Sequence, residues 1–205
     1  MTPQIIHRGN KLVLVFDICS SSNIIEDLTL TGNVIRFRSL IVSLQKWLED
    51  RERTEETSVY KFVGDGWIIL FSYHVSGQLL LDFMVGLSSH FLNLMRKDIM
   101  PCLECKPNII GLTFGIERGE LVRFNLSNEN EFVGRALNIA CRLQNAVKDK
   151  GTSPEFRVLV SNQVYNFYFK KLPGLKAFRV TRVLRNIRNG EQYRCVKFNL
   201  AHLIK

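Results

Sequence analysis

Two aspartates lie where carboxylates could do chemistry rather than only end a strand or a turn. Asp17 ends the apolar run "KLVLVFDI" (residues 11–18), the pattern of a buried strand whose C-terminal end carries a polar group. Asp65 lies at the tip of "SVYKFVGDGWIILF" (residues 58–71), in which an Asp-Gly step between two apolar runs predicts a tight β-hairpin. Aspartate is common in turns for conformational reasons, so Asp65 by itself predicts only the turn.

The segments around these aspartates alternate between strand and helix patterns. Apolar residues at helical spacing predict one long or broken helix over 21–49, interrupted near Gly32, and a second long helix over 76–97. The other predicted elements are a strand pair in 109–126 that bends near Gly119, a third helix in 128–151 entered through Gly134 and closed by Gly151, a strand at 156–160, a short helix after Ser161 and two strands within 178–200. This order predicts an α+β fold with a ferredoxin-like βαββαβ core, its sheet covered by helices, in one domain over residues 1–205.

This topology predicts that the two aspartates meet. In a βαββαβ sheet the first strand lies beside the central hairpin, so the end of that strand and the hairpin tip are close together. Asp17 and Asp65 would repel each other unless a cation lies between them, and divalent metals are the usual answer when the substrate carries phosphates. Two such ions roughly 3.5–4 Å apart can activate an attacking oxygen and stabilise a leaving one. The alternative is that both aspartates only cap strand ends.

Composition limits the classes of protein that remain. No apolar run approaches the roughly 18–20 residues of a membrane span, and the N-terminus lacks a secretion signal, so we expect a cytoplasmic protein without membrane contact. The net charge of +9 fits a polyanionic partner, either nucleic acid or a phosphorylated small molecule. Because the basic residues are spread along the chain, nucleic acid is the weaker expectation.

Cysteine and histidine do not form a convincing metal or disulfide framework. The five cysteines are an odd number, which fits a reducing compartment. Cys102 and Cys105 have CxxC spacing, but no second pair and no nearby histidine completes a zinc site. The four histidines are scattered along the sequence, so each is expected to be a surface or packing residue.

Three segments together resemble the signature segments of class III nucleotide cyclase catalytic domains. They are "FDICSSSNIIEDL" with Asp17, "KFVGDG" with Asp65, and "EFVGRALNIACRLQ" in the predicted third helix. They occur in the order and spacing of that family, and the resemblance runs over about residues 11–198. It implies that Asp17 and Asp65, helped by the backbone of Ile18, hold two Mg²⁺ or Mn²⁺ ions. It also implies a head-to-tail homodimer with active sites between the protomers.

The resemblance implies roles for five further residues. Asn138 would orient the ribose, and Arg142 would stabilise charge that builds on the α-phosphate when the 3′-hydroxyl attacks it. Their i, i+4 spacing places both on one helix face, although spacing alone describes ordinary surface residues equally well. Lys61 would read the base together with Glu131, and Arg185 would contact the triphosphate. In the family's arrangement Lys61 and the metal-binding aspartates serve different active sites, so a lone protomer should be inactive.

The identity of the base stays open at this point. A lysine donor and a glutamate acceptor match adenine, cytosine and uracil. Adenylate cyclases usually have aspartate where this chain has Glu131, and the longer side chain favours a smaller base. The chain is little more than a catalytic unit and looks like the pyrimidine cyclases of the bacterial Pycsar antiphage system. That resemblance implies conversion of UTP, or CTP, to a cyclic nucleotide read by a separate cyclic-nucleotide-binding effector.

Other classes of function remain as alternatives. An adenylate cyclase making cAMP from ATP has the same hydrogen-bonding code. A catalytically silent nucleotide-binding homologue is possible, although such proteins tend to lose the metal-binding aspartates. A polymerase-palm enzyme or dinucleotide cyclase shares the βαββαβ core but is not expected to have Lys61, Asn138 and Arg142. Nucleic-acid binding driven by the charge of +9 is the last alternative.

Overall fold

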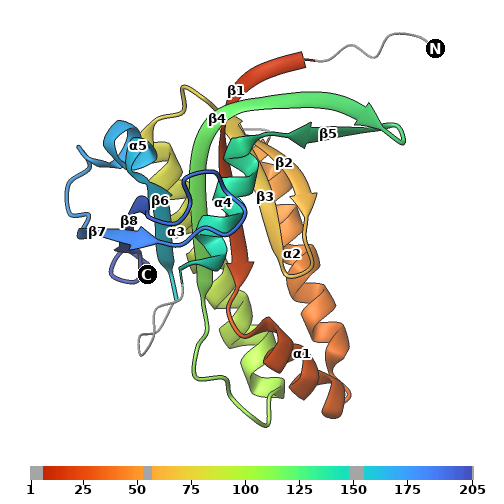
Figure 1. Ribbon diagram of the computed structural model, residues 1–205. Coiled ribbons are helices and arrows are strands. Elements are labelled where there is room, and N and C mark those ends of the chain that lie inside the picture. The colour runs from red at the N-terminus through yellow and green to blue at the C-terminus, as the bar shows by residue number, and fades with distance from the viewer. Residues whose placement is uncertain (1–6, 53–56, 148–154, 205) are drawn as a thin grey trace.

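The computed structural model describes residues 7–52, 57–147 and 155–204, which form one mixed sheet and the helices on its two faces (Figure 1). The strands are β1 (His7–Ile18), β2 (Thr57–Phe62), β3 (Gly66–Ser72), β4 (Leu112–Leu126), β5 (Glu129–Val133), β6 (Arg157–Ser161), β7 (Ala177–Arg182) and β8 (Tyr193–Asn199). The main helices are α1 (Ser21–Leu30), α2 (Val34–Glu52), α3 (Gly77–Leu94), α4 (Arg135–Asn145) and α5 (Asn162–Val164). Short π-helical turns follow α3 at Met95–Ile99 and α5 at Tyr165–Phe169, and a 3₁₀ turn covers Met100–Cys102.

Strand β1 is central to the sheet. The strand order is β2-β3-β1-β4-β6-β8-β7, with β5 also paired to β4. β1 is antiparallel to both of its neighbours, β3 and β4, whereas β4 and β6 are parallel. The predicted position of the first strand beside the central hairpin is therefore confirmed.

The alternation of side chains along β1 supplies a core on each face of the sheet. Leu12, Leu14 and Phe16 point to the larger core, which they share with apolar residues of α1, α2 and α3. Val13 and Val15 point to the other face, which α4 covers. In Figure 1, α4 accordingly crosses one face of the sheet while α2 and α3 lie behind it. None of the helices in the described residues is both long and apolar enough to cross a membrane.

Helix α4 lies unusually close to β4 because of a glycine. A Cβ atom at Gly115 would lie 2.3 Å from the carbonyl oxygen of Ala140 and 2.3 Å from the amide nitrogen of Gln144. Only a residue without a side chain lets the helix backbone approach the strand this closely. Gln144 then donates a buried 2.9 Å hydrogen bond to the Thr113 hydroxyl, which fixes the end of the helix on the sheet.

The predicted order of elements is confirmed, but one boundary is wrong. Residues 109–126 do not contain a strand pair that bends near Gly119, because β4 continues through Gly119, which pairs with Lys11 of β1. The turn comes at Ser127 and Asn128, which both have positive φ, and β5 then pairs back onto β4. Two residues with positive φ are typical of the tight hairpin turns that match strand twist.

Two predicted helices also change in extent. The segment 128–151 contributes β5 before α4 begins at Arg135, and the predicted closing residue Gly151 lies outside the described residues. The predicted interruption of the helix over 21–49 near Gly32 is confirmed: α1 and α2 are separated by a turn in which Gly32 has φ +71°, and α2 continues to Glu52. The strands within 178–200, the strand near 156–160 and the short helix after Ser161 lie where they were expected.

The close contact between β1 and β3 predicts that any side chain at position 66 destabilises the fold. A Cβ atom there would lie 2.0 Å from the carbonyl oxygen of Phe16, so Gly66→Ala must push the two strands apart. We expect a loss of about 1–3 kcal/mol in the free energy of unfolding, measured by chemical denaturation. Gly9→Ala on β1 is the matched control, because nothing lies within 4 Å of the added Cβ atom. Equal stability of the two variants would contradict the prediction.

Candidate active site

The ladder between β1 and β3 brings Asp17 and Asp65 to the same end of the sheet. Asp17 is paired with Gly66, the residue that follows Asp65. The amide of Ile18 donates a 3.2 Å hydrogen bond to the carbonyl oxygen of Asp65, which ties the hairpin turn to the end of β1. Both aspartates are half-buried. We call Asp17, Ile18 and Asp65 the aspartate end.

Helix α1 starts directly beside the aspartate end. The hydroxyl of Ser21, the first residue of α1, donates a hydrogen bond to the Asp65 carboxylate. Ser20 precedes it in the left-handed region, at φ 58°, which turns the chain sharply from β1 into the helix. The Asp65 carboxylate is therefore oriented by a neighbouring element as well as by its own turn.

The CxxC segment packs against the same helix as a structural loop. The buried Asp27 carboxylate of α1 accepts hydrogen bonds from the amides of Glu104 (2.9 Å) and Cys105 (3.2 Å). Cys102 contacts the carbonyl oxygen of Asp98 through its thiol group. These contacts use the loop backbone to fix α1, and both cysteines are free thiols.

The aspartate end has the ligand types that suit a hard divalent cation. Mg²⁺ prefers carboxylate and carbonyl oxygens, and in phosphate-transferring sites it is held by one or two carboxylates plus substrate phosphates and water. Asp17, Asp65 and the backbone of Ile18 match that donor set. Within the described ranges no group of three His, Cys, Asp or Glu residues could hold a metal ion. A cation held by these groups would complete its coordination shell with water or phosphate oxygens.

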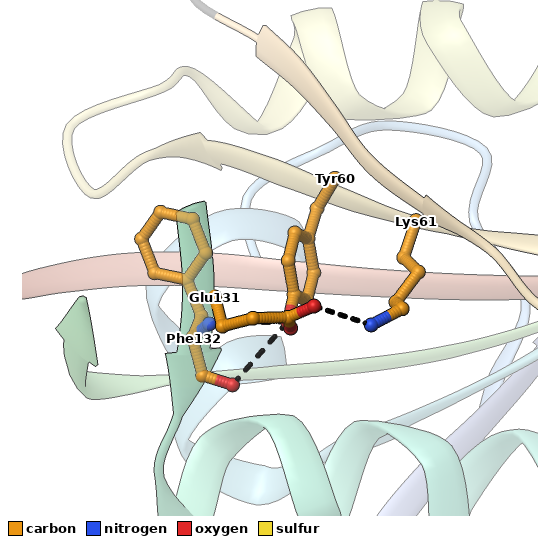
Figure 2. Close-up of polar contacts among 4 residues, drawn as sticks. All are labelled: Tyr60, Lys61, Glu131 and Phe132. Atoms are coloured by element: carbon orange, nitrogen blue, oxygen red, sulfur yellow. Dashed lines mark hydrogen bonds and ion pairs between the residues drawn. The ribbon is translucent and has the colours of Figure 1, made fainter. Parts of the chain in front are cut away.

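A second cluster forms where β2 faces β5. Lys61 and Glu131 form an ion pair with 2.6 Å between Nζ and Oε1, and their side chains are 48% and 16% exposed. The hydroxyl of Tyr60 donates a hydrogen bond to Oε2 of the same carboxylate. Tyr60 in turn accepts a 3.0 Å hydrogen bond from the amide of Phe132. Figure 2 also shows the longer contact, 3.5 Å, between the Tyr60 hydroxyl and the Phe132 carbonyl oxygen. We call Tyr60, Lys61, Glu131 and Phe132 the base-edge cluster.

A β-bulge explains why Tyr60 and Lys61 both reach Glu131. Val59 pairs with Ile69 and Lys61 pairs with Ile68, so Tyr60 is an extra residue in β2. In a regular strand successive side chains point to opposite faces, but a bulge changes their direction. Figure 2 shows the side chains of Tyr60 and Lys61 extending from β2 toward Glu131.

The electrostatics of the base-edge cluster keep Glu131 an acceptor. The ammonium of Lys61 and then the hydroxyl of Tyr60 lower the pKa of Glu131 below its ordinary value. The same carboxylate raises the pKa of Lys61, and burial followed by Glu131 raises the pKa of Tyr60. At neutral pH the cluster therefore presents a charged acceptor next to a charged donor, with Tyr60 still carrying its proton.

Helix α4 presents Asn138 and Arg142 to solvent. Both side chains are exposed, whereas Ile139, Ala140 and Leu143 on the other side of α4 are buried against the sheet. The surface around Asn138 and Arg142 is open for a second molecule to contact.

Arg185 is exposed on the loop between β7 and β8. Arg135 at the start of α4 donates a 2.9 Å hydrogen bond to the carbonyl oxygen of Arg188 in that loop. At the end of the loop, Tyr193 donates a 2.6 Å hydrogen bond to the buried Glu117 carboxylate. The loop is thus held against α4, with Arg185 on its surface.

Sequence reasoning left open whether Tyr60 approaches the base and favoured a core position, so Tyr60 was not counted among the site residues. Strand alternation predicts that it points away from the face that Lys61 uses, and an aromatic residue in a strand usually belongs to the core. The bulge was not predicted. A one-residue bulge leaves no periodic signal in the sequence, so it becomes visible only in the pairing of β2 with β3.

The ion pair predicts a titration shift. Lys61→Met removes the largest influence that lowers the pKa of Glu131, so this pKa should rise, as measured by carbon-13 NMR of the carboxyl group. Because folding lowers the pKa, the pair's contribution to stability is present above the unfolded-state pKa and is lost as pH falls through the folded-state pKa. Lys11→Met on β1 is the matched control and should leave the pKa of Glu131 unchanged. An unchanged pKa of Glu131 in Lys61→Met would contradict the assigned ion pair.

Comparison with known proteins identifies the fold. No protein-family model matches the sequence, and no curated protein matches it either. Solved structures do match: the adenylyl cyclase CyaB from P. aeruginosa has a TM-score of 0.71 at 16% identity and covers 95% of each chain. The guanylyl cyclase Cya2 has a TM-score of 0.69 at 15% identity and covers 94% of this chain and 92% of its own.

A third solved structure extends the comparison. The adenylate/guanylate cyclase/hydrolase from Silicibacter pomeroyi has a TM-score of 0.63 at 18% identity, covering 95% of this chain and 99% of its own. At such identities the likeness concerns the fold. The chain thus has the α+β fold of class III adenylyl and guanylyl cyclase domains, as the sequence predicted.

Proposed function

We propose that the protein is a nucleotide cyclase that converts UTP, or CTP, to the 3′,5′-cyclic nucleotide and pyrophosphate. The observation that carries this proposal is the Lys61–Glu131 ion pair, which places a charged donor and a charged acceptor side by side on a cyclase fold. The exposed Asn138 and Arg142 on α4 and the two neighbouring aspartates supply the remaining parts. Each protomer then contributes two different half-sites.

The aspartate end is the proposed metal half-site. Asp17, Asp65 and the backbone of Ile18 would hold two Mg²⁺ or Mn²⁺ ions, for which their oxygen donors are suited. When bound, such ions activate the attacking 3′-oxygen and neutralise charge on the phosphates. Ser21 fixes the Asp65 carboxylate by its hydrogen bond, so less side-chain entropy is lost when a ligand binds.

The residues of α4 and the β7–β8 loop are the proposed transition-state half-site. The guanidinium group of Arg142 would donate hydrogen bonds to the charge that develops on the α-phosphate. Stabilising this developing charge lowers the reaction barrier. Asn138, one turn earlier on the same exposed face, would hold the ribose so that its 3′-hydroxyl lies in line with the leaving pyrophosphate. Arg185 would contact the triphosphate.

The base-edge cluster supports a pyrimidine. Lys61 can donate to O4 of uracil or to N3 of cytosine, and Glu131 can accept from N3–H of uracil or from the amino group of cytosine. The ring of Tyr60 occupies space beside Glu131, in addition to the longer glutamate side chain. Both features favour the smaller class of base. Adenine presents the same donor and acceptor pattern, so adenylate cyclase activity is the second candidate.

The two half-sites favour assembly of two copies. Asn138 and Arg142 are exposed on the face of α4 that points away from the sheet. A head-to-tail homodimer would bring the α4 surface of one copy to the aspartate end of the other, which completes two equal active sites. By resemblance to pyrimidine cyclases of antiphage systems, the product would be a second messenger read by a separate effector protein.

The activity is tested by incubating the purified chain with each of the four nucleoside triphosphates and Mn²⁺, and by identifying products by mass spectrometry. We expect cyclic UMP or cyclic CMP as the main product. Cyclic AMP as the main product would overturn the pyrimidine assignment in favour of the second candidate. Absence of any cyclic product would overturn the cyclase proposal.

Shared active sites are tested by mixing two inactive variants, Asp65→Ala and Arg142→Ala. Each variant alone should lose essentially all turnover. Mixed dimers keep one intact site, so random exchange of subunits should restore about a quarter of the wild-type activity. A mixture of Asp17→Ala with Asp65→Ala is the control and should stay inactive, because both changes affect the aspartate end. No recovery in the first mixture would contradict the dimer.

A further inference from the structure

We infer that the hydroxyl group of Tyr60 is a positioning group for base selection, which holds the Glu131 carboxylate so that its Oε1 atom, beside Lys61, meets the base. This inference rests on the proposed function and adds a residue to the site. Tyr60 acts through Glu131 and need not touch the substrate itself.

The Glu131 carboxylate is held at both of its oxygens. The bulge in β2 sends Tyr60 to the face where Lys61 meets Glu131, and each of the two residues takes a different carboxylate oxygen. A glutamate side chain has three rotatable bonds, and a carboxylate held at only one oxygen can still rotate about that contact. Held at both oxygens, from two adjacent residues of one strand, it keeps one orientation.

The Tyr60 hydroxyl both accepts and donates a hydrogen bond. The amide of Phe132 donates a hydrogen bond to the Tyr60 oxygen. The Tyr60 proton has two acceptors within reach, and it goes to the much nearer Glu131 carboxylate rather than to the Phe132 carbonyl oxygen at 3.5 Å. The ring of Tyr60 also packs edge-on against that of Phe132, with 5.0 Å between centroids. A chain of hydrogen bonds that each polarise the next is stronger than the separate bonds. Phe132 therefore fixes Tyr60, and Tyr60 fixes Glu131.

The fixed carboxylate restricts which base edge can bind beside Lys61. Because Tyr60 satisfies Oε2 and helps to keep the carboxylate ionised, Oε1 accepts only from an N–H group of the substrate. Lys61, 2.6 Å away, supplies the neighbouring donor. The cluster selects a base edge with an N–H donor beside an acceptor. Without Tyr60, the Glu131 carboxylate can turn toward solvent, so Oε1 no longer keeps one position beside Lys61.

The test is Tyr60→Phe, which removes the hydroxyl but keeps the ring that packs on Phe132. We expect roughly a tenfold rise in KM for the preferred triphosphate, because one hydrogen bond to a charged group is lost. The value of kcat should change much less. Discrimination among the four triphosphates should fall, and the pKa of Glu131 should rise in carbon-13 NMR. Tyr165→Phe is the matched control, because its hydroxyl makes no hydrogen bond within the described residues and it lies in the other core.

A second comparison separates positioning from packing. In the Glu131→Ala background, Tyr60→Phe should have almost no further effect on KM, since the group through which it acts is gone. An equal rise in KM in both backgrounds, or an unchanged KM and Glu131 pKa in Tyr60→Phe, would overturn the inference while leaving the cyclase proposal intact. Failure of the wild-type protein to form any cyclic nucleotide would instead overturn the proposed function, and the base-selecting role with it.

Discussion

The antiparallel register between β1 and β3 is the constraint on which the rest of the candidate site depends. It sets Asp17 opposite Gly66, and the backbone hydrogen bond from Ile18 to Asp65 then holds the hairpin tip against the end of β1. A slip by one residue would turn every side chain of β1 to the opposite face and exchange its two cores. Two well-separated hydrophobic cores therefore maintain the position of two carboxylates.

A local irregularity complements this regular ladder. The bulge at Tyr60 breaks the alternation of β2 where it faces β5, so two successive side chains converge on Glu131. Bulges are over-represented beside active sites because they change the direction of a side chain without moving the rest of the sheet. The base-edge cluster depends on this departure from regular geometry, whereas the aspartate end depends on the regular pairing of β1 and β3.

The sequence predicted those parts of the fold that depend on periodicity and turn chemistry. Apolar runs and the Asp-Gly step located β1 and the β2–β3 hairpin, and helical spacing located α2, α3 and α4. The error at Gly119 has a physical cause: glycine was taken as a bend, but here it continues a long strand, and the positive φ values that make the turn belong to Ser127 and Asn128. Propensity alone does not distinguish these cases.

The candidate site was predictable to the extent that it follows from topology and motif. The neighbouring positions of Asp17 and Asp65 follow from strand order, and the shared exposed face of Asn138 and Arg142 follows from helical spacing. The contact between Lys61 and Glu131 joins residues 70 positions apart and came only from the family resemblance. Tyr60 was missed because a one-residue bulge leaves no periodic signal in the sequence.

We propose that the two aspartates bind divalent cations, which hold a nucleoside triphosphate at the boundary between two copies of the chain. The most direct test of this proposal is a crystal structure with Mn²⁺ and a 3′-deoxy analogue of the preferred triphosphate, in which anomalous scattering locates the metal. We expect manganese bound by both Asp17 and Asp65, with Asn138 and Arg142 of a second copy at the ribose and α-phosphate. Manganese bound elsewhere, or a nucleotide held within one copy alone, would contradict it.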